Sequence, residues 1–163
     1  MKKTLIWLAT AMLLIFSGNT KVLATDHDFR AVQMHEVLVE YKSPMVGLED
    51  VMIATADKYH LDWTFMAAVA GTESSFGRRM PANCINPYGW GIYGDNKICF
   101  KSYEDAIEQV GSGLAEKYNT KSVGSIAHTY NTVSTNGWMN HTEYFMNKIK
   151  TAEIPVSSIP VTL

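Results

Sequence analysis

The chain has 163 residues, of which 47% are hydrophobic, and its 14 basic and 16 acidic side chains give a formal net charge of −2. This length allows one domain with a buried core, and the chain has no basic stripe that could grip nucleic acid phosphates. The five histidines lack metal-ligand spacing, and glycines 89, 91 and 94 lack the Lys-Ser/Thr of a phosphate loop. We therefore expect no nucleic acid partner, no metal and no other cofactor.

Residues 1–24 match the pattern of an export signal peptide. Lys2 and Lys3 precede an apolar run from Leu5 to Phe16, and Val22 and Ala24 precede the expected cleavage site. The run is about a dozen residues, whereas a membrane-spanning helix needs about 20; an uncleaved membrane anchor is the alternative. Cleavage removes 3 of the 14 basic residues and no acidic one, so 139 residues remain with 11 basic and 16 acidic side chains, a net charge of −5. We expect an exported monomer without a stable membrane span, located in the periplasm, the medium or the cell wall.

The remaining chain is predicted to be mainly α-helical. Residues 25–43 form a lead-in segment with a loose helix around Phe29–Tyr41, residues 44–150 form the main domain, and residues 151–163 form a tail. Apolar residues recur at helical spacing in five segments of the main domain: 48–59, 63–72, 102–118, 123–130 and 138–149. The segment 63–72 is apolar on nearly every side, which is typical of a buried helix, and Asp62 is placed to cap it. Strand signals are limited to Gly91–Tyr93 and Ile98–Phe100.

Cys84 and Cys99 are the two cysteines of the chain. In an exported protein, two cysteines at this spacing indicate a disulfide, and the alternative is a pair of buried free thiols. Closing a loop of that size stabilises a fold by about 3 kcal/mol in the chain-entropy model. The loop between them is rich in glycine and tyrosine and has little capacity to pack by itself.

Glu73 is the strongest catalytic candidate on physical grounds. It ends the predicted buried helix, where the negative end of the helix dipole and apolar neighbours both favour the protonated carboxyl. A raised pKa is what a general acid working near neutral pH requires. The alternative is that Glu73 lies on the exposed side of a fraying helix end, or caps a neighbouring loop.

Several segments resemble motifs of lytic transglycosylases and related glucosaminidases. Ala70–Gly77, with sequence AGTESSFG, resembles the Glu-Ser motif that closes the catalytic helix in those families. The other four segments follow the same order along the chain as in the families: Ala56–Trp63, Asn86–Tyr93, Phe100–Ala106 and Thr129–Asn131. The resemblance runs from about Ser43 to Lys150. It implies a mainly α, lysozyme-like single domain with a short disulfide-closed loop or β-ribbon beside the catalytic helix.

The same resemblance implies a chemistry. The substrate would be the β-1,4 bond between N-acetylated amino sugars of peptidoglycan, with Glu73 protonating the glycosidic oxygen. In transglycosylases the same residue then activates the muramoyl 6-hydroxyl to form a 1,6-anhydro end, whereas in hydrolases water attacks. The substrate N-acetyl group can replace a second carboxylate; if a partner acid exists, Asp95 is the first candidate. Tyr130 matches a tyrosine that holds the glutamate or the N-acetyl group, and its alternative is a core tyrosine.

The remaining candidates are substrate-binding residues. Tyr88, Trp90 and Tyr93 can stack on sugar faces, although we expect at least one of them to pack beneath the loop instead. Asn86 and Asn131 are candidates for polar contacts with the glycan, and Asn86 has a turn-stabilising role as its alternative. Ser74 belongs to the same set, although we expect its hydroxyl to bond the backbone at the helix end as structural support.

The chain also departs from the transglycosylase pattern. Transglycosylases usually carry Gly-Leu-Met-Gln after the Asn segment, where this chain has Gly89 to Tyr93, and the Gly expected two residues after Asn131 is Val133. These differences favour the glucosaminidase side, and they leave open which product forms and whether cutting is endo or exo.

The alternative from another class is a secreted glycan-binding module without catalysis. A role in opening the wall for a secretion or conjugation apparatus is a third reading, compatible with activity.

Overall fold

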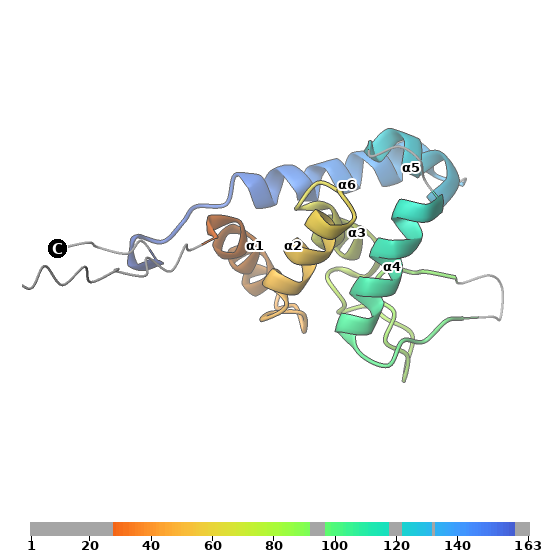
Figure 1. The fold of residues 1–163 in the computed structure, drawn as a ribbon, viewed down its shortest axis with the longest axis horizontal. Coiled ribbons are helices and arrows are strands. Elements are labelled where there is room, and N and C mark those ends of the chain that lie inside the picture. Colours follow the sequence, from red (N-terminus) through yellow and green to blue (C-terminus); the bar gives the residue numbers. More distant parts are fainter. Residues whose placement is uncertain (1–27, 92–96, 118–121, 132, 159–163) are drawn as a thin grey trace, which may run out of the picture.

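A computed structural model describes residues 28–91, 97–117, 122–131 and 133–158, without the side chains of Thr129, Tyr130 and Ser157. The predicted signal segment 1–24 lies outside these residues. Six α-helices and one 3-10 turn make up the described chain (Figure 1): α1 Phe29–Glu40, α2 Glu49–Lys58, α3 Phe65–Ser74, α4 Tyr103–Lys117, α5 Val123–Tyr130, α6 Thr135–Lys150 and η1 Val156–Ser158. The prediction of a mainly helical chain is confirmed. Nowhere in the described ranges is a helix long and apolar enough to cross a membrane.

The strand predictions are wrong where the structure can test them. Among the described residues, pairing is limited to one antiparallel bridge between Ile85 and Phe100. Gly91 lies in a turn with φ +65°, and the two residues after it fall outside the described part. The segment around Cys99 is therefore a loop pinned at one point, because a single bridge supplies too few hydrogen bonds to propagate a ribbon.

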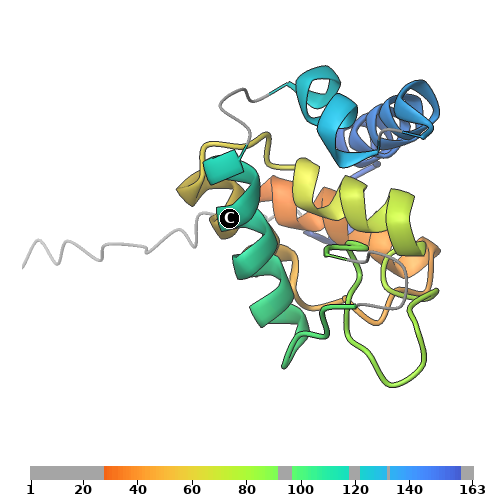
Figure 2. The ribbon, with the colours of Figure 1, turned by 90° about the vertical axis from the view of Figure 1, so that its right-hand side faces the viewer.

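Helix α3 forms the centre of the core (Figure 2), as its all-round apolar sequence predicts. Every residue from Phe65 to Gly71 is buried. The helix begins two residues later than predicted because Asp62 caps a preceding turn, accepting hydrogen bonds from the backbone N–H and the hydroxyl of Thr64 at 3.0 and 2.6 Å. The Asp62 carboxylate also pairs with Lys150 at 2.6 Å, which ties the start of α3 to the end of α6.

Helix α6 packs closely along α3. A Cβ on Gly71 would lie 2.7 Å from the Phe76 ring and 2.9 Å from the Phe145 ring, so only glycine fits at this point of α3. The rings of Tyr41, Phe76 and Phe145 meet with centroids 4.9 to 5.6 Å apart. This aromatic cluster fixes α6 against the C-terminal end of α3, where Glu73 is located.

The lead-in helix is well packed. In α1, Met34, Val37 and Leu38 are buried in the core. The Gln33 side-chain amide donates a hydrogen bond to the Lys150 carbonyl at 2.8 Å, at the C-terminal end of α6. Helix α1 is therefore part of the same core as the segment 44–150.

The disulfide prediction is confirmed: Cys84 and Cys99 are bonded, with Cα atoms 5.0 Å apart. The bond closes the loop that leaves the end of α3 and returns to the start of α4. Helix α4 lies beside this loop in Figure 2, and its close contact with α2 is permitted by Gly111, whose Cβ would lie 2.5 Å from Thr55. The disulfide and the bridge between Ile85 and Phe100 thus join the two ends of the loop.

Candidate functional site

Glu73 lies in the last turn of α3 and is half-buried. Its Oε1 accepts a hydrogen bond from the indole Nε1–H of Trp138 on α6 at 2.5 Å. Trp138 is only 4% exposed, so its ring is fixed by packing as well as by this bond. The orientation of the Glu73 carboxyl therefore depends on the packing of α3 against α6, since Glu73 and Trp138 are 65 positions apart in the sequence.

The environment of Glu73 favours its protonated form. Burial removes water from the carboxyl and raises the pKa of Glu73 above its ordinary value, while the hydrogen bond from Trp138 opposes this rise in part. Desolvation is the larger of the two effects, so the pKa is raised. A carboxylic acid that holds its proton closer to neutral pH can act as a general acid.

The chain turns sharply after Glu73. Ser75, Phe76 and Gly77 all have positive φ, at 51°, 57° and 81°, and this conformation is strained for a residue as bulky as phenylalanine. The turn is held because the Phe76 N–H donates to the Ala70 carbonyl at 2.9 Å and the Ser43 hydroxyl donates to the Phe76 carbonyl at 2.8 Å. A strained backbone of this kind persists only where surrounding contacts hold it in place. Here the strained turn ends α3 directly after Glu73.

Ser74 connects this turn to the loop beyond it. Its hydroxyl donates to the Pro87 carbonyl at 2.7 Å, also lies 3.0 Å from the Ala70 carbonyl, and accepts from the Gly77 N–H at 2.8 Å. Ser74 is buried at 3% exposure. These bonds are the backbone contacts expected of Ser74 at the helix end, and they place the Asn86–Trp90 segment against the end of α3.

Asn86 organises that segment from within. Its side-chain amide donates to the carbonyls of Trp90 and Ile98 at 2.8 and 2.9 Å, and its side-chain oxygen accepts from the Trp90 N–H at 3.0 Å. Asn86 is 1% exposed. The structure thus gives Asn86 the role of a cross-link inside the loop, which is its turn-stabilising alternative.

The loop reaches the carboxyl at Gly89. Gly89 has φ +60°, and a Cβ built on it would lie 2.8 Å from Glu73 Oε2. Real side chains essentially never approach so closely, so the absence of a side chain at this position allows the loop backbone to pack against the carboxyl. In the sequence, Gly89 stands out only as a member of the Asn86–Tyr93 segment, with no role of its own.

The three aromatic candidates have different positions. Tyr88 is fully buried, and burial raises the pKa of its phenol; it meets the expectation that at least one of the three packs beneath the loop. Trp90 is half-buried and packs on α4, where a Cβ on Gly113 would lie 2.6 Å from its ring, with Lys117 Nζ 5.0 Å from the ring centroid. Tyr93 lies outside the described residues.

Asn131 lies at the C-terminal end of α5, where its Oδ1 accepts from the Ser134 N–H at 2.8 Å and its carbonyl accepts from the Thr135 hydroxyl at 2.9 Å. It therefore shapes the start of α6, the helix that carries Trp138. The Tyr130 side chain and Asp95 lie outside the described part of the chain, so their predicted roles remain predictions.

Trp138 is the residue of this site that sequence reasoning missed. The apolar period of the last helix marks it as a core position. A buried indole N–H usually has a hydrogen-bond partner, which is the one signal that a polar contact exists, but nothing in the sequence says that the partner is Glu73.

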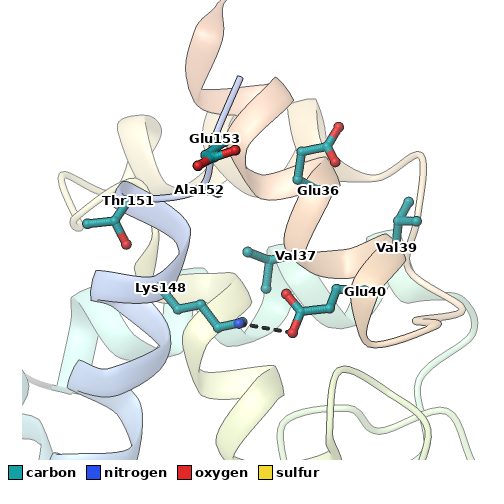
Figure 3. A pocket seen from close by; sticks show the side chains of 8 residues that line it. All are labelled: Glu36, Val37, Val39, Glu40, Lys148, Thr151, Ala152 and Glu153. Carbon is teal, nitrogen blue, oxygen red and sulfur yellow. Dashed lines mark ion pairs between the residues drawn. The ribbon is translucent and has the colours of Figure 1, made fainter. Parts of the chain in front are cut away.

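A separate hollow of about 410 Å³ lies between α1 and the C-terminal end of α6 (Figure 3). It is lined partly by Glu36, Glu40 and Glu153, and Lys148 pairs with Glu40 at 2.9 Å. Lys148 is ten residues beyond Trp138 on α6, which corresponds to roughly 15 Å along a helix. This hollow is therefore distinct from the surroundings of Glu73.

Comparison of the chain with protein-family models, with curated proteins and with solved structures gives no match. Within the described ranges, no group of three or more His, Cys, Asp or Glu side chains could hold a metal ion. The site is accordingly described by its own geometry: one half-buried carboxyl, an indole donor on one of its oxygens and a glycine beside the other.

Proposed function

We propose that the protein is a secreted glycosidase of the lysozyme-like type that cleaves the β-1,4 bond between N-acetylated amino sugars of peptidoglycan, with Glu73 as general acid. The observation that carries this proposal is the state of Glu73: a half-buried carboxyl with a raised pKa, fixed at Oε1 by Trp138 and packed at Oε2 against the backbone of Gly89. The motif order along the sequence supplies the substrate class.

In the proposed reaction Glu73 donates its proton to the glycosidic oxygen as the bond from that oxygen to C1 breaks. The bonding electrons leave with the oxygen, and the positive charge that develops at C1 is shared with the substrate N-acetyl group. The Glu73 carboxylate then takes a proton from the group that attacks C1. An attacking 6-hydroxyl gives an anhydro end, and water gives a reducing end. Proton transfer of this kind contributes about 10²–10⁴ in rate.

The test is mass spectrometry of purified peptidoglycan digested by the mature protein, beside Glu73→Gln. Glutamine keeps a carbonyl acceptor for Trp138 and removes only the acid. We expect the wild type alone to release muropeptides, and their ends to identify a transglycosylase or a hydrolase. Glycan binding by both proteins without release of fragments would reject the enzyme in favour of a binding module.

A further inference from the structure

The two oxygens of the Glu73 carboxyl have different surroundings. Trp138 Nε1–H donates to Oε1 at 2.5 Å. An indole N–H is a donor only, and it bonds best to the carbonyl oxygen of a carboxylic acid or to a carboxylate. When Glu73 is protonated, Oε1 is therefore the carbonyl oxygen and the acidic proton is on Oε2.

Oε2 faces the loop. It is the atom that a Cβ on Gly89 would approach to 2.8 Å. The Gly89 backbone is itself fixed, because Asn86 bonds the N–H and carbonyl of the next residue, Trp90, and Ser74 bonds the Pro87 carbonyl. The proton is thus on the oxygen that Trp138 does not bond, beside a loop backbone whose position is fixed.

We infer that Trp138 is a positioning residue for Glu73, which holds Oε1 as an acceptor so that the acidic proton is on Oε2 and is donated to the glycosidic oxygen from that atom. This inference rests on the proposed function. After proton transfer the same N–H donates to the carboxylate and stabilises it, and Oε2 accepts the proton of the attacking hydroxyl or water. The hydrogen bond therefore favours the ionised form and limits the rise in the pKa of Glu73 that burial causes.

The first test needs no enzymatic activity. In the mature protein, NMR would follow the indole ¹⁵N–¹H resonance of Trp138 and the ¹³C carboxyl resonance of Glu73 against pH. We expect both resonances to shift with one midpoint, and the shift of the indole to disappear in Glu73→Gln. An indole resonance that ignores the ionisation of Glu73 would overturn the inference and leave the proposed function in place.

The second test is kinetic and uses soluble glycan strands. We expect Trp138→Phe to lower kcat by about tenfold or more with little change in KM, because the acid is misdirected while the sugar contacts remain. The high-pH limb of the kcat profile moves to higher pH, since removing the N–H raises the pKa of Glu73 and activity requires its proton. A role confined to packing would reduce the amount of folded protein without moving this limb.

Two further variants make the kinetic test specific. Replacing Trp138 with a benzothiophene analogue removes the N–H and keeps the ring shape, so we expect it to reproduce the shifted limb. Trp63→Phe applies the same substitution to a half-buried tryptophan at the other end of α3 and should leave the pH profile unchanged. An unshifted limb and unchanged kcat in both Trp138 variants would overturn the inference alone, whereas an inactive wild type would overturn the proposed function with it.

Discussion

Gly89 and Glu73 are in contact where no side chain can be accommodated: a Cβ on Gly89 would lie 2.8 Å from the carboxyl oxygen Oε2. The contact joins the disulfide-closed loop to the end of the buried helix α3. In the proposed enzyme the loop backbone therefore confines the carboxyl from one side, while Trp138 holds its other oxygen.

The first prediction concerns Gly89→Ala. The added methyl group must displace the Glu73 carboxyl or the loop, so we expect kcat/KM to fall by about tenfold or more. The positive φ adds a backbone cost of roughly 1 kcal/mol, measured by urea unfolding. Gly47→Ala is the matched control, because Gly47 also has a positive φ, 93°, but a Cβ there meets nothing within 4 Å. Equal activity losses in the two variants would show that the contact with Glu73 has no catalytic weight.

The second prediction concerns the disulfide. Reduction, or Cys84→Ser with Cys99→Ser, is expected to lower the free energy of unfolding by about 3 kcal/mol. Activity should fall as well, because the loop that carries Gly89 is less restrained against Glu73. Guanidinium unfolding with and without reductant measures the first effect, and the double variant should not respond to reductant. Full activity of the reduced protein would show that the packing of the loop suffices without the bond.

The helices and the buried acid could be predicted because they depend on local patterns. The all-round apolar sequence of α3 predicts its burial, and the burial predicts the raised pKa of Glu73, which the structure gives with desolvation as its main cause. The disulfide could be predicted from the spacing of the two cysteines together with the expected export signal. Each of these features depends on a single segment of the sequence or, for the disulfide, on the two cysteines alone.

The contacts between segments could not be predicted in this way. Periodicity indicates which face of the last helix is apolar. The hydrogen bond between Trp138 and Glu73, however, depends on the position and rotation of α6 relative to α3. These are set by tertiary contacts such as that between Gly71 and Phe145. The same holds for the loop: composition marks Asn86 and Tyr88 as polar and aromatic, and only the fold shows that both face inward.

The third prediction concerns Ser74→Ala. The substitution removes the donor to the buried Pro87 carbonyl and the acceptor for the Gly77 N–H, and leaving such groups unsatisfied costs about 1–3 kcal/mol. Urea unfolding should show this loss, and activity should fall because the loop is no longer tied to the end of α3. Ser112→Ala is the control, since the Ser112 hydroxyl donates to the exposed Glu116 carboxylate at 3.0 Å and the expected change is within about 0.5 kcal/mol. Identical stabilities of the two variants would contradict the role assigned to Ser74.

The fourth prediction concerns the pH dependence of stability. Burial raises the pKa of Glu73 in the folded protein above its value in the unfolded chain, so between these two values the folded state binds more protons. The free energy of unfolding contributed by this group then falls as pH rises through that window and stays low above it. Glu73→Gln removes the ionisation, so we expect the variant to be more stable than the wild type at neutral pH.

This difference in stability should shrink as pH falls below the ordinary pKa of a glutamic acid, where the carboxyl is neutral in both states. Thermal unfolding of both proteins from acid to neutral pH measures it. A variant that is less stable than the wild type at neutral pH would mean that the charge-assisted bond to Trp138 outweighs desolvation, and that the pKa of Glu73 is lowered by the fold instead of raised. In that case the residue would suit a base better than an acid. A greater stability of Glu73→Gln combined with lost activity is the result expected of a site that holds its acid in an unfavourable environment for the sake of catalysis.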